Sequence, residues 1–531
     1  MDRFFNTAGP TKTDINYYIS SFERVDYEEI EMLINSQRYF VLHAPRQTGK
    51  TSALLEIMDR INSESKYNCV YANIEEAQAL RGDTSESIPT ISDVIASSIR
   101  LYLKDDRVIN WYRENRKTIP IGKQISEVLS YWCENSSKPC IMFLDEVDAL
   151  VGDTLISLLR QIRAGYTGRP KSFPQSMILC GVRDVRDYRI HTKDNEIITG
   201  GSAFNIKAES LTIGNFTYKE CQALYKQHTD YTGQKFDKRI FPHLWEDTKG
   251  QPWLVNALGH ELTWKERELR DRTKDITLEH YFRARERLIY SRATHLDQLV
   301  DKLKEPRVKR IIEPILKGDS KKQSLNPRDI EYLVDLGLIT RDKRGKIEIS
   351  NNIYKETIPR ELTWGMQSSI SNQEQHWYIK KDNTIDMVKL LKAFQQFFRE
   401  NADSWIERFD YKEAGPQLLL QAFLQRIVNG GGRINREYGL GRKRTDILIE
   451  YPLDEEMGFW GETQKIVIET KILYSNLKKT IEKGIEQTLE YSDIVGANES
   501  HLIIFDRSAD IKWEDKIWDK RDESGVMIWG S

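Results

Sequence analysis

The chain has 531 residues, which is too long for one hydrophobic core and predicts three or four domains. Hydrophobic residues make up 39% of it and charged residues 30%, a balance typical of a soluble globular protein. No apolar run could span a bilayer and the N-terminus lacks a signal-peptide pattern, so we expect a cytoplasmic protein with no membrane partner. The five cysteines have no zinc or redox spacing, which also favours a reducing compartment. The net charge of −2 selects no partner, because basic residues can be concentrated locally.

The first motif is a strand, a tight loop and a helix near the N-terminus. Residues 38–43 read as a buried strand and residues 52–58 as a helix. The loop between them has the pattern of a P-loop, in which backbone N–H groups and the helix N-terminus hold phosphates. We predict that Lys50 reaches the β- and γ-phosphates of ATP and that Thr51 binds Mg²⁺. The predicted nucleotide-binding residues are Ala44, Pro45, Arg46, Gln47, Thr48, Gly49, Lys50, Thr51 and Ser52; Ala44 replaces the usual first glycine.

The second motif follows a later apolar strand, residues 140–144, which ends in Asp145 and Glu146. Several apolar residues ending in Asp-Glu form a Walker B pattern, which is informative here because a P-loop precedes it. We expect Asp145 to bind Mg²⁺ through water and Glu146 to polarise the water that attacks the γ-phosphate. Residues 176–181 predict a third strand of the same sheet.

A resemblance becomes specific when four segments are taken together. Residues 4–10, residues 17–19, residues 44–51 and the turn Gly250-x-Pro252 resemble the AAA-like ATPases allied to the STAND group of signalling NTPases. The resemblance covers roughly residues 1–290. It implies that Pro252 lies in a helical lid whose turn contacts the nucleotide, and that the N-terminal segment lies against the base. It also implies a switch whose nucleotide state sets the conformation or assembly of attached domains, and we expect a homo-oligomer.

The middle of the chain predicts two helices and a hairpin. Residues 299–318 are amphipathic, residues 328–336 form a second helix, and residues 338–350 read as a hairpin. This order looks like a winged helix. Its basic residues would bind nucleic-acid phosphates, or the domain would serve equally well as a spacer or a protein contact. Those residues are Arg341, Lys343, Arg344 and Lys346.

Two apolar strands near the C-terminus carry acidic residues and a lysine. Side chains alternate along a strand, so Glu469 and Lys471 are expected to share one face while Thr470 turns away. Asp446 on the adjoining strand can meet Glu469, which gives two carboxylates for Mg²⁺ or Mn²⁺. The metal would lower the pKa of a bound water and neutralise charge on a phosphodiester, and Lys471 would position that water. This pattern predicts a nuclease site.

Further residues could complete this site. Glu413, before a helix expected at residues 416–428, could supply a third carboxylate, and Gln487 lies one turn from Tyr491 on a helix expected at residues 480–491. A basic run beside Asp446 would neutralise a phosphate backbone, although a solvated loop is the alternative. The predicted nucleic-acid-binding residues are Arg436, Arg442, Lys443 and Arg444.

The expected order is helix 416–428, strands at residues 433–437, 445–450 and 464–472, helix 480–491 and a strand at residues 501–505. This order resembles the PD-(D/E)XK nuclease superfamily, with Asp446, Glu469 and Lys471 matching its motif. The usual proline before the first aspartate is Thr445 here. The alternative is an ordinary α/β sheet with charged edges. Members of the superfamily that are fused to AAA-like ATPases suggest a prokaryotic role in defence or mobile-element control.

The sequence therefore predicts a multidomain α/β protein with a P-loop NTPase, which has a parallel sheet and a helical lid, a winged-helix-like domain and a restriction-endonuclease-like domain of the PD-(D/E)XK type. The expected boundaries are 1–205 for the NTPase core, 206–295 for the lid, 296–365 for the winged helix, 366–410 for a helical connector and 411–531 for the nuclease. The expected function is ATP-regulated cleavage of nucleic acid, with DNA favoured over RNA. A signalling ATPase whose nuclease-like domain only binds nucleic acid or a protein partner is the alternative, and a DNA motor ranks last because helicase motifs are absent.

Overall fold

The computed structural model of the chain forms two compact units, Met1–Val308 with Ser324–Glu356, and Lys309–Gln323 with Thr357–Ser531. No helix among the described residues is long and apolar enough to cross a bilayer. For residues 433, 435–440 and 443–445, only the backbone is described. The structure describes residues 3–182, 189–191, 197–199, 206–290, 302–303, 305–316, 326–341, 345, 347–362, 377–408, 420, 423–424, 433–440, 443–454, 461–473, 476–506, 508 and 511–531.

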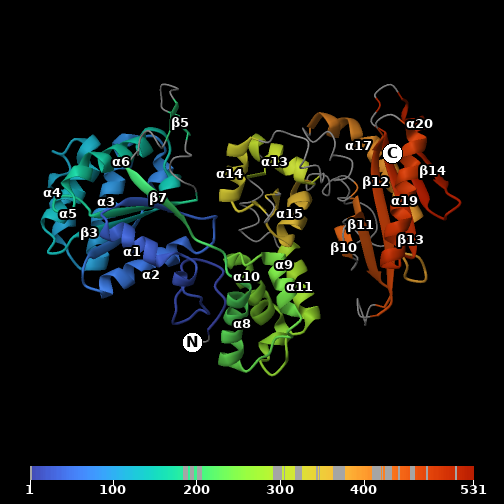
Figure 1. Cartoon of the computed structure of the whole chain (residues 1–531), viewed down its shortest axis with the longest axis horizontal. Helices are drawn as coiled ribbons and strands as arrows, with labels where there is room; N and C mark the ends of the chain where they lie inside the picture. Colours follow the sequence, from blue (N-terminus) through green and yellow to red (C-terminus); the bar gives the residue numbers. More distant parts are fainter. Residues whose placement is uncertain are drawn as a thin grey trace. The chain divides into compact units, whose positions relative to one another are not determined.

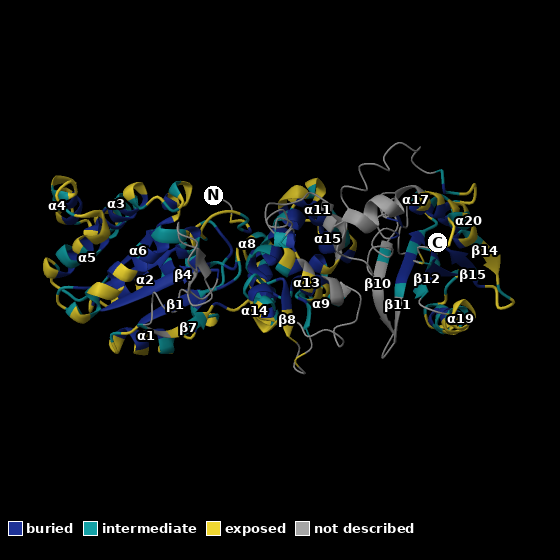
Figure 2. Cartoon of the chain, turned by 90° about the horizontal axis from the view of Figure 1, so that it is seen from above, coloured by how far each residue is buried: buried dark blue, intermediate teal, exposed yellow. Residues whose placement is uncertain are grey.

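The first unit is built on a five-stranded sheet in which every neighbouring pair of strands is parallel (Figure 1). The strands β1 (Tyr39–His43) and β4 (Ser176–Gly181), dark blue in Figure 2, are buried along almost their whole length, and so is β3 (Cys140–Asp145), as expected when helices cover both faces of a sheet. This arrangement confirms the predicted parallel sheet of a P-loop nucleotide-binding fold. The strand order is β2 (Asn68–Asn73), β3 (Cys140–Asp145), β4 (Ser176–Gly181), β1 (Tyr39–His43) and β7 (Lys207–Thr212).

Two hydrophobic clusters hold the helices to this sheet. Alternation along β1 sends Tyr39 and Val41 into one cluster and Phe40 and Leu42 into the other. The first cluster packs α3 (Thr84–Leu103), α4 (Arg107–Asn115), α5 (Gln124–Glu134) and α6 (Gly152–Gly165). The second packs α1 (Tyr27–Asn35) and α2 (Lys50–Ser63).

A helical lid follows the sheet and consists of α8 (Tyr218–Thr232), α9 (Ile240–Thr248), α10 (Pro252–His260) and α11 (Leu278–Tyr290). The N-terminal segment enters this lid, because Phe5 is fully buried and its ring lies 5.0 Å from that of Tyr225. Trp253 Nε1 also donates a hydrogen bond of 2.9 Å to the Thr7 carbonyl. The first residues of the chain therefore connect the lid to the nucleotide-binding sheet.

The middle of the chain contains the predicted helices and hairpin with altered bounds: α13 (Pro306–Leu316), α14 (Pro327–Asp335), β8 (Ile339–Arg341), β9 (Ile347–Ile349) and α15 (Asn352–Leu362). The helix α13 begins at a proline, which is favoured in a first turn. The hairpin strands pair in antiparallel register, Ile339 with Ile349. Arg341 pairs with Glu331, whereas Lys343, Arg344 and Lys346 lie outside the described residues. The winged helix stays a prediction.

The second unit contains a six-stranded mixed sheet that covers the predicted strands and two more. The central strand β13 (Glu499–Asp506) pairs in parallel with β12 (Thr463–Leu473) and β15 (Met527–Gly530), and the outer pairs are antiparallel. The predicted strands are present with longer bounds, whereas β15 and β14 had not been predicted. The order is β10 (Arg433–Leu440), β11 (Lys443–Pro452), β12 (Thr463–Leu473), β13 (Glu499–Asp506), β15 (Met527–Gly530) and β14 (Trp518–Arg521).

Helices cover both faces of this second sheet. The helix α17 (Met387–Arg408) packs on one face through a cluster that includes Phe394 and Ile468. The helix α19 (Leu477–Val495) packs on the other face, where Tyr491 contacts Leu448 and Val467. Gly484 allows this close approach, because a Cβ there would lie 2.6 Å from the Leu502 side chain. A short helix, α20 (Trp513–Lys516), precedes β14.

Candidate functional site

The P-loop lies between β1 and α2, as predicted. Gln47 and Gly49 both have left-handed backbone angles, with φ of 58° and 87°. These angles fix the orientation of the peptide groups on either side of Thr48. Ala44 is buried and is not among the residues with positive φ, which explains why the loop tolerates alanine in place of glycine. Arg46 is exposed, and Ser52 Oγ accepts a hydrogen bond of 2.9 Å from the Thr11 N–H.

Lys50 and Thr51 lie where nucleotide phosphates and their metal would bind. The Lys50 ammonium is buried and donates to the carbonyls of Ala44 (3.0 Å) and Pro45 (3.1 Å). The Thr51 hydroxyl donates a hydrogen bond of 2.9 Å to Asp145 Oδ2. This bond joins the P-loop residue and the Walker B residue that are predicted to hold Mg²⁺. This oxygen-only pair beside a buried ammonium fits an ATP–Mg²⁺ complex.

The structure adds Tyr71 to this site, which the sequence reasoning missed. Its hydroxyl donates to Asp145 Oδ2 at 2.9 Å from the neighbouring strand β2. The pairing of β2 with β3 places Asn73 opposite Asp145. The only available signal was the short apolar run Cys69–Ala72 before the Walker B strand, because strand register is set by the tertiary fold.

Glu146 follows β3 in a left-handed conformation with φ of 59°. Its pKa is raised, first by burial and then by the charges of Asp148 and Asp145, while Lys50 opposes the shift. A carboxylate with a raised pKa is a better proton acceptor, which suits a residue that polarises an attacking water. The charge of Glu75 also contributes to the raised pKa, so Glu75 lies within electrostatic reach of Glu146.

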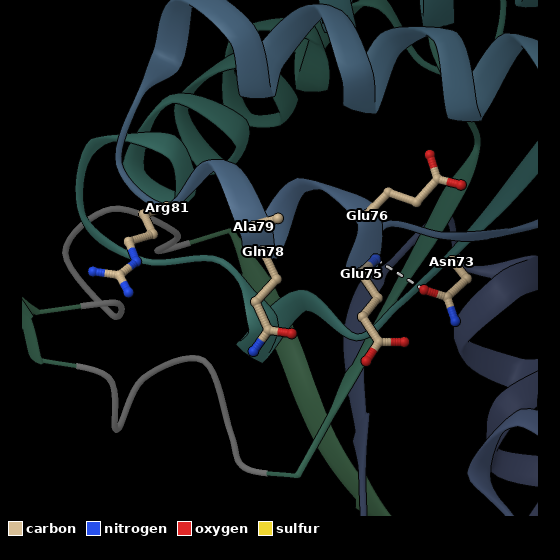
Figure 3. A pocket seen from close by; sticks show the side chains of 6 residues that line it. All are labelled: Asn73, Glu75, Glu76, Gln78, Ala79 and Arg81. Atoms are coloured by element: carbon tan, nitrogen blue, oxygen red, sulfur yellow. Dashed lines mark hydrogen bonds between the residues drawn. The ribbon is translucent and has the colours of Figure 1, made fainter.

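A polar cavity of about 810 Å³ opens at the end of β2. Asn73 Oδ1 accepts a hydrogen bond of 2.9 Å from the Glu75 N–H, and the carboxylates of Glu75 and Glu76 point in opposite directions (Figure 3). Since Asn73 is paired with Asp145, the cavity lies at the carboxyl edge of the parallel sheet, where such folds bind ligands. Its other lining residues are Gln78, Ala79 and Arg81.

The lid reaches the P-loop through the predicted Gly250-x-Pro252 turn. Gly250 has φ of 72°, and a Cβ there would lie 1.8 Å from the Phe216 carbonyl oxygen, so only glycine fits. Pro252 occupies the first turn of α10. Between them, Gln251 Nε2 donates to the Gln47 carbonyl at 3.3 Å. Gln251 was not predicted, yet it is the residue of this turn that contacts the P-loop.

In the second unit, Asp446 and Glu469 lie together at the place where β11 and β12 stop pairing, one step beyond the pair Ile447 and Ile468. The Asp446 N–H donates to Glu469 Oε2 at 3.4 Å. The Lys471 ammonium lies 2.6 Å from Glu469 Oε1. Burial, and then the charge of Asp446, raises the pKa of Glu469 to about 7, against the opposing effect of Lys471. Two carboxylates this close favour a shared cation.

One expectation for this strand was wrong. Thr470 does not turn away from the acidic pair, because its hydroxyl donates to Asp446 Oδ2 at 2.6 Å and its N–H donates to the same oxygen at 2.9 Å. The strands separate here, so the Asp446 carboxylate reaches between them to the Thr470 backbone. Thr470 therefore holds one oxygen of Asp446, a role that strict alternation could not predict.

The remaining predicted residues of this site are not brought into contact within the described part of the chain. Gln487 is half-buried on α19, which covers the sheet face of Val467, but it makes no described hydrogen bond to either carboxylate. Glu413 and Arg442 lie outside the described residues, and Arg436, Lys443 and Arg444 are described only in their backbone. Among described residues, no group of three or more acidic, histidine or cysteine side chains could hold a metal. Asp446 and Glu469 are the two predicted carboxylate ligands that the described part of the chain brings together.

The family comparison concerns the N-terminal two thirds of the chain. A family model described as an AAA-like domain matches residues 6–358, more than half of the sequence. No curated protein matches the chain. The Walker-type ATPase PABY2304 of Pyrococcus abyssi is similar in structure, with a TM-score of 0.45 and 14% identity over 67% of this chain and 99% of that one.

Two further solved structures are similar. ORC1 of Aeropyrum pernix, solved in complex with DNA, has a TM-score of 0.34 and 13% identity over 69% of this chain and 95% of that one. The RuvB Holliday junction branch migration motor of Thermotoga maritima has a TM-score of 0.32 and 12% identity over 62% of this chain and 92% of that one.

Proposed function

The chain belongs to the AAA-like domain family, and we propose from this premise that it is a P-loop ATPase whose nucleotide state controls a metal-dependent nuclease in the second unit. The ATPase part is supported by the family match and by the P-loop fold. The nuclease part depends on one observation, the pairing of Asp446 and Glu469 with Lys471 2.6 Å from Glu469.

In the first unit, the described residues are arranged for nucleotide hydrolysis. Lys50 exchanges its two carbonyl partners for the β- and γ-phosphates when ATP binds. Thr51 and Asp145, which are hydrogen-bonded to each other at 2.9 Å, would hold Mg²⁺, and this ion would neutralise charge on the phosphates. Glu146, with its raised pKa, orients the attacking water.

In the second unit, the acidic pair has the chemistry for phosphodiester hydrolysis. Asp446 and Glu469 would hold Mg²⁺ or Mn²⁺, and this ion would supply a bound water of lowered pKa. Thr470 fixes one oxygen of Asp446, which leaves Oδ1 for the ion. Lys471 positions the water and stabilises negative charge on the phosphate. We assign a third carboxylate to Glu413 and a supporting role to Gln487.

We propose DNA as the substrate and place Arg436, Arg442, Lys443 and Arg444 on its phosphates. These basic residues closely precede Asp446 in the sequence, and a phosphate backbone would neutralise their charge. The nucleotide state of a homo-oligomeric ATPase would then set access to the cutting site. Control of this kind suits prokaryotic defence or mobile-element control, in which cutting has to wait for a signal.

The test is a cleavage assay on double-stranded DNA, single-stranded DNA and RNA, with Mg²⁺ or Mn²⁺ and with or without ATP. Wild type is compared with Lys50→Ala and Glu469→Ala, and with Glu462→Gln as a control at an exposed position just before β12. We expect Glu469→Ala to abolish cutting, Lys50→Ala to remove its response to ATP, and Glu462→Gln to behave as wild type. If the protein binds nucleic acid but does not cut it under any of these conditions, the second unit is a binding domain and the proposed nuclease activity is wrong.

A further inference from the structure

Arg24 lies between the P-loop and the start of the lid. It follows the short helix η1 (Ser21–Glu23), and its side chain is half-buried. Its Nη1 donates to the Thr48 carbonyl at 2.7 Å and to the Gly214 carbonyl at 3.2 Å. One guanidinium nitrogen thus joins the phosphate-binding loop to the segment that leads from the last strand of the sheet to the lid.

The contact with the P-loop is close. A Cβ at Gly49 would lie 3.2 Å from Arg24 Nη2, so the guanidinium rests on the glycine that ends the loop. Thr48, whose carbonyl Arg24 holds, stands between the left-handed residues Gln47 and Gly49. Its peptide could rotate if nothing held the carbonyl, and the loop N–H groups would then lose the orientation that phosphates require.

The contact with the lid has several parts. The Gly214 N–H donates back to the Arg24 carbonyl at 3.1 Å, and the guanidinium lies 5.0 Å from the centre of the Phe216 ring. The Phe216 N–H donates to the Gly250 carbonyl at 2.9 Å. Arg24 therefore contacts Phe216, which is hydrogen-bonded to the Gly250 turn. The next residue of that turn, Gln251, donates a hydrogen bond to the Gln47 carbonyl.

Arg24 is costly to hold in this place. Burial lowers the pKa of its guanidinium, an effect that the charges of Glu220 and Glu56 oppose. Its Nε is buried without a hydrogen-bond partner among the residues that the structure describes. A charged group with an unsatisfied donor opposes folding, so packing alone does not account for an arginine at this position.

We propose that Arg24 is a positioning residue for nucleotide binding, which holds the Thr48 peptide in its phosphate-binding orientation and ties that orientation to the lid. This proposal rests on nucleotide binding at the P-loop and is independent of the nuclease. Because the P-loop amides contact phosphates before and during hydrolysis, the loss of their orientation weakens binding of substrate and transition state alike. The expected kinetic effect is a raised KM with kcat almost unchanged.

The experiment compares wild type with Arg24→Gln and Arg24→Lys, and with Glu23→Gln as a control at the exposed neighbouring position. Titration with a fluorescent ADP analogue gives the nucleotide Kd, and steady-state ATP hydrolysis gives KM and kcat. We expect Arg24→Gln to raise Kd and KM by about tenfold to a hundredfold, the effect of losing a hydrogen bond to a charged group. The ammonium of Arg24→Lys should restore part of the affinity, because it can still donate to the Thr48 carbonyl.

A merely structural role predicts a different result. If Arg24→Gln only destabilises the fold, fewer molecules are active, so apparent kcat falls while KM and Kd stay as in wild type. That result, or a Kd within twofold of wild type, would overturn the proposal. Thermal unfolding of each variant without nucleotide shows that it is folded. If wild type itself binds no nucleotide, the assignment of the P-loop fails instead, and with it the premise of this role.

Discussion

Lowering the pH from 7 to 5 is expected to destabilise the helical lid, because His228 has to stay neutral there. Its side chain is only 1% exposed. His228 Nε2 lies 2.8 Å from Gln234 Oε1, whose amide nitrogen already donates to two carbonyls, so Nε2 carries the ring proton. Nδ1 then accepts from the Tyr17 hydroxyl at 3.0 Å. A second ring proton would have to displace that hydrogen bond.

The magnitude follows from the pKa. Burial lowers the pKa of His228 from 6.5 to about 4; the hydrogen bond to Gln234 opposes this shift and the charge of Arg272 adds to it. Between these values the unfolded chain binds a proton that the folded protein does not. The contribution of neutral His228 to the free energy of unfolding is therefore present above pH 6.5 and is lost as the pH falls towards 4. The full loss is about 3 kcal/mol, of which about 2 kcal/mol falls between pH 7 and pH 5.

Urea unfolding at pH 5, 6 and 7 measures this loss in wild type and in His228→Gln, which removes the titrating group. We expect the pH dependence of wild type to exceed that of the variant by about 2 kcal/mol over this range. His280→Gln, which removes a lid histidine bonded to Thr277 and Glu268, serves as the matched control. Parallel pH profiles for wild type and His228→Gln would refute the reasoning.

Three other predictions follow from single contacts. Glu146→Gln should lower ATP turnover by about a hundredfold or more, with little change in nucleotide Kd, because it removes a proton acceptor and not a phosphate ligand. Gly250→Ala should destabilise the first unit by ~2 kcal/mol or more, measured by thermal unfolding, because its Cβ would meet the Phe216 carbonyl. Thr470→Val should weaken Mn²⁺ binding by about tenfold in a titration, because it removes one donor from Asp446, whereas Thr470→Ser should not. Equal Mn²⁺ affinity in both Thr470 variants would contradict the role given to this hydroxyl.

The nucleotide-binding fold could be predicted because its sequence signals are local. A buried strand, a loop with Gly49 and Lys50, and a helix specify one another within a short segment. The edge strand β2 and the contribution of Tyr71 were missed, since the register between β2 and β3 is fixed only when helices cover both faces of the sheet.

The acidic pair could be predicted as a pair, but not in its details. Alternation along β12 puts Glu469 and Lys471 on one face, and their ion pair of 2.6 Å agrees with that expectation. Alternation also predicted that Thr470 points away, and this was wrong because β11 and β12 separate beside Asp446. The alternation of side chains along a strand does not reveal where two neighbouring strands stop pairing.

Residues distant in sequence account for most of what the sequence did not predict. Arg24 meets Thr48 and Gly214 only after the N-terminal segment has packed against both the sheet and the lid. Gln251 lies within the predicted turn, but the Gly-x-Pro pattern specifies only its neighbours Gly250 and Pro252. The contacts of these residues come from tertiary packing, which composition and periodicity do not encode.

The central claim is that the nucleotide bound at the P-loop controls cutting by the acidic pair. The most direct measurement is the rate of DNA cleavage by the full chain with Mg²⁺ as the ATP concentration is raised, set beside the nucleotide Kd of the same protein. The account predicts that the rate changes with ATP and that its midpoint agrees with the Kd, and that Glu469→Ala cuts at no concentration. A cleavage rate that is the same at every ATP concentration, or cutting that survives in Glu469→Ala, would contradict it.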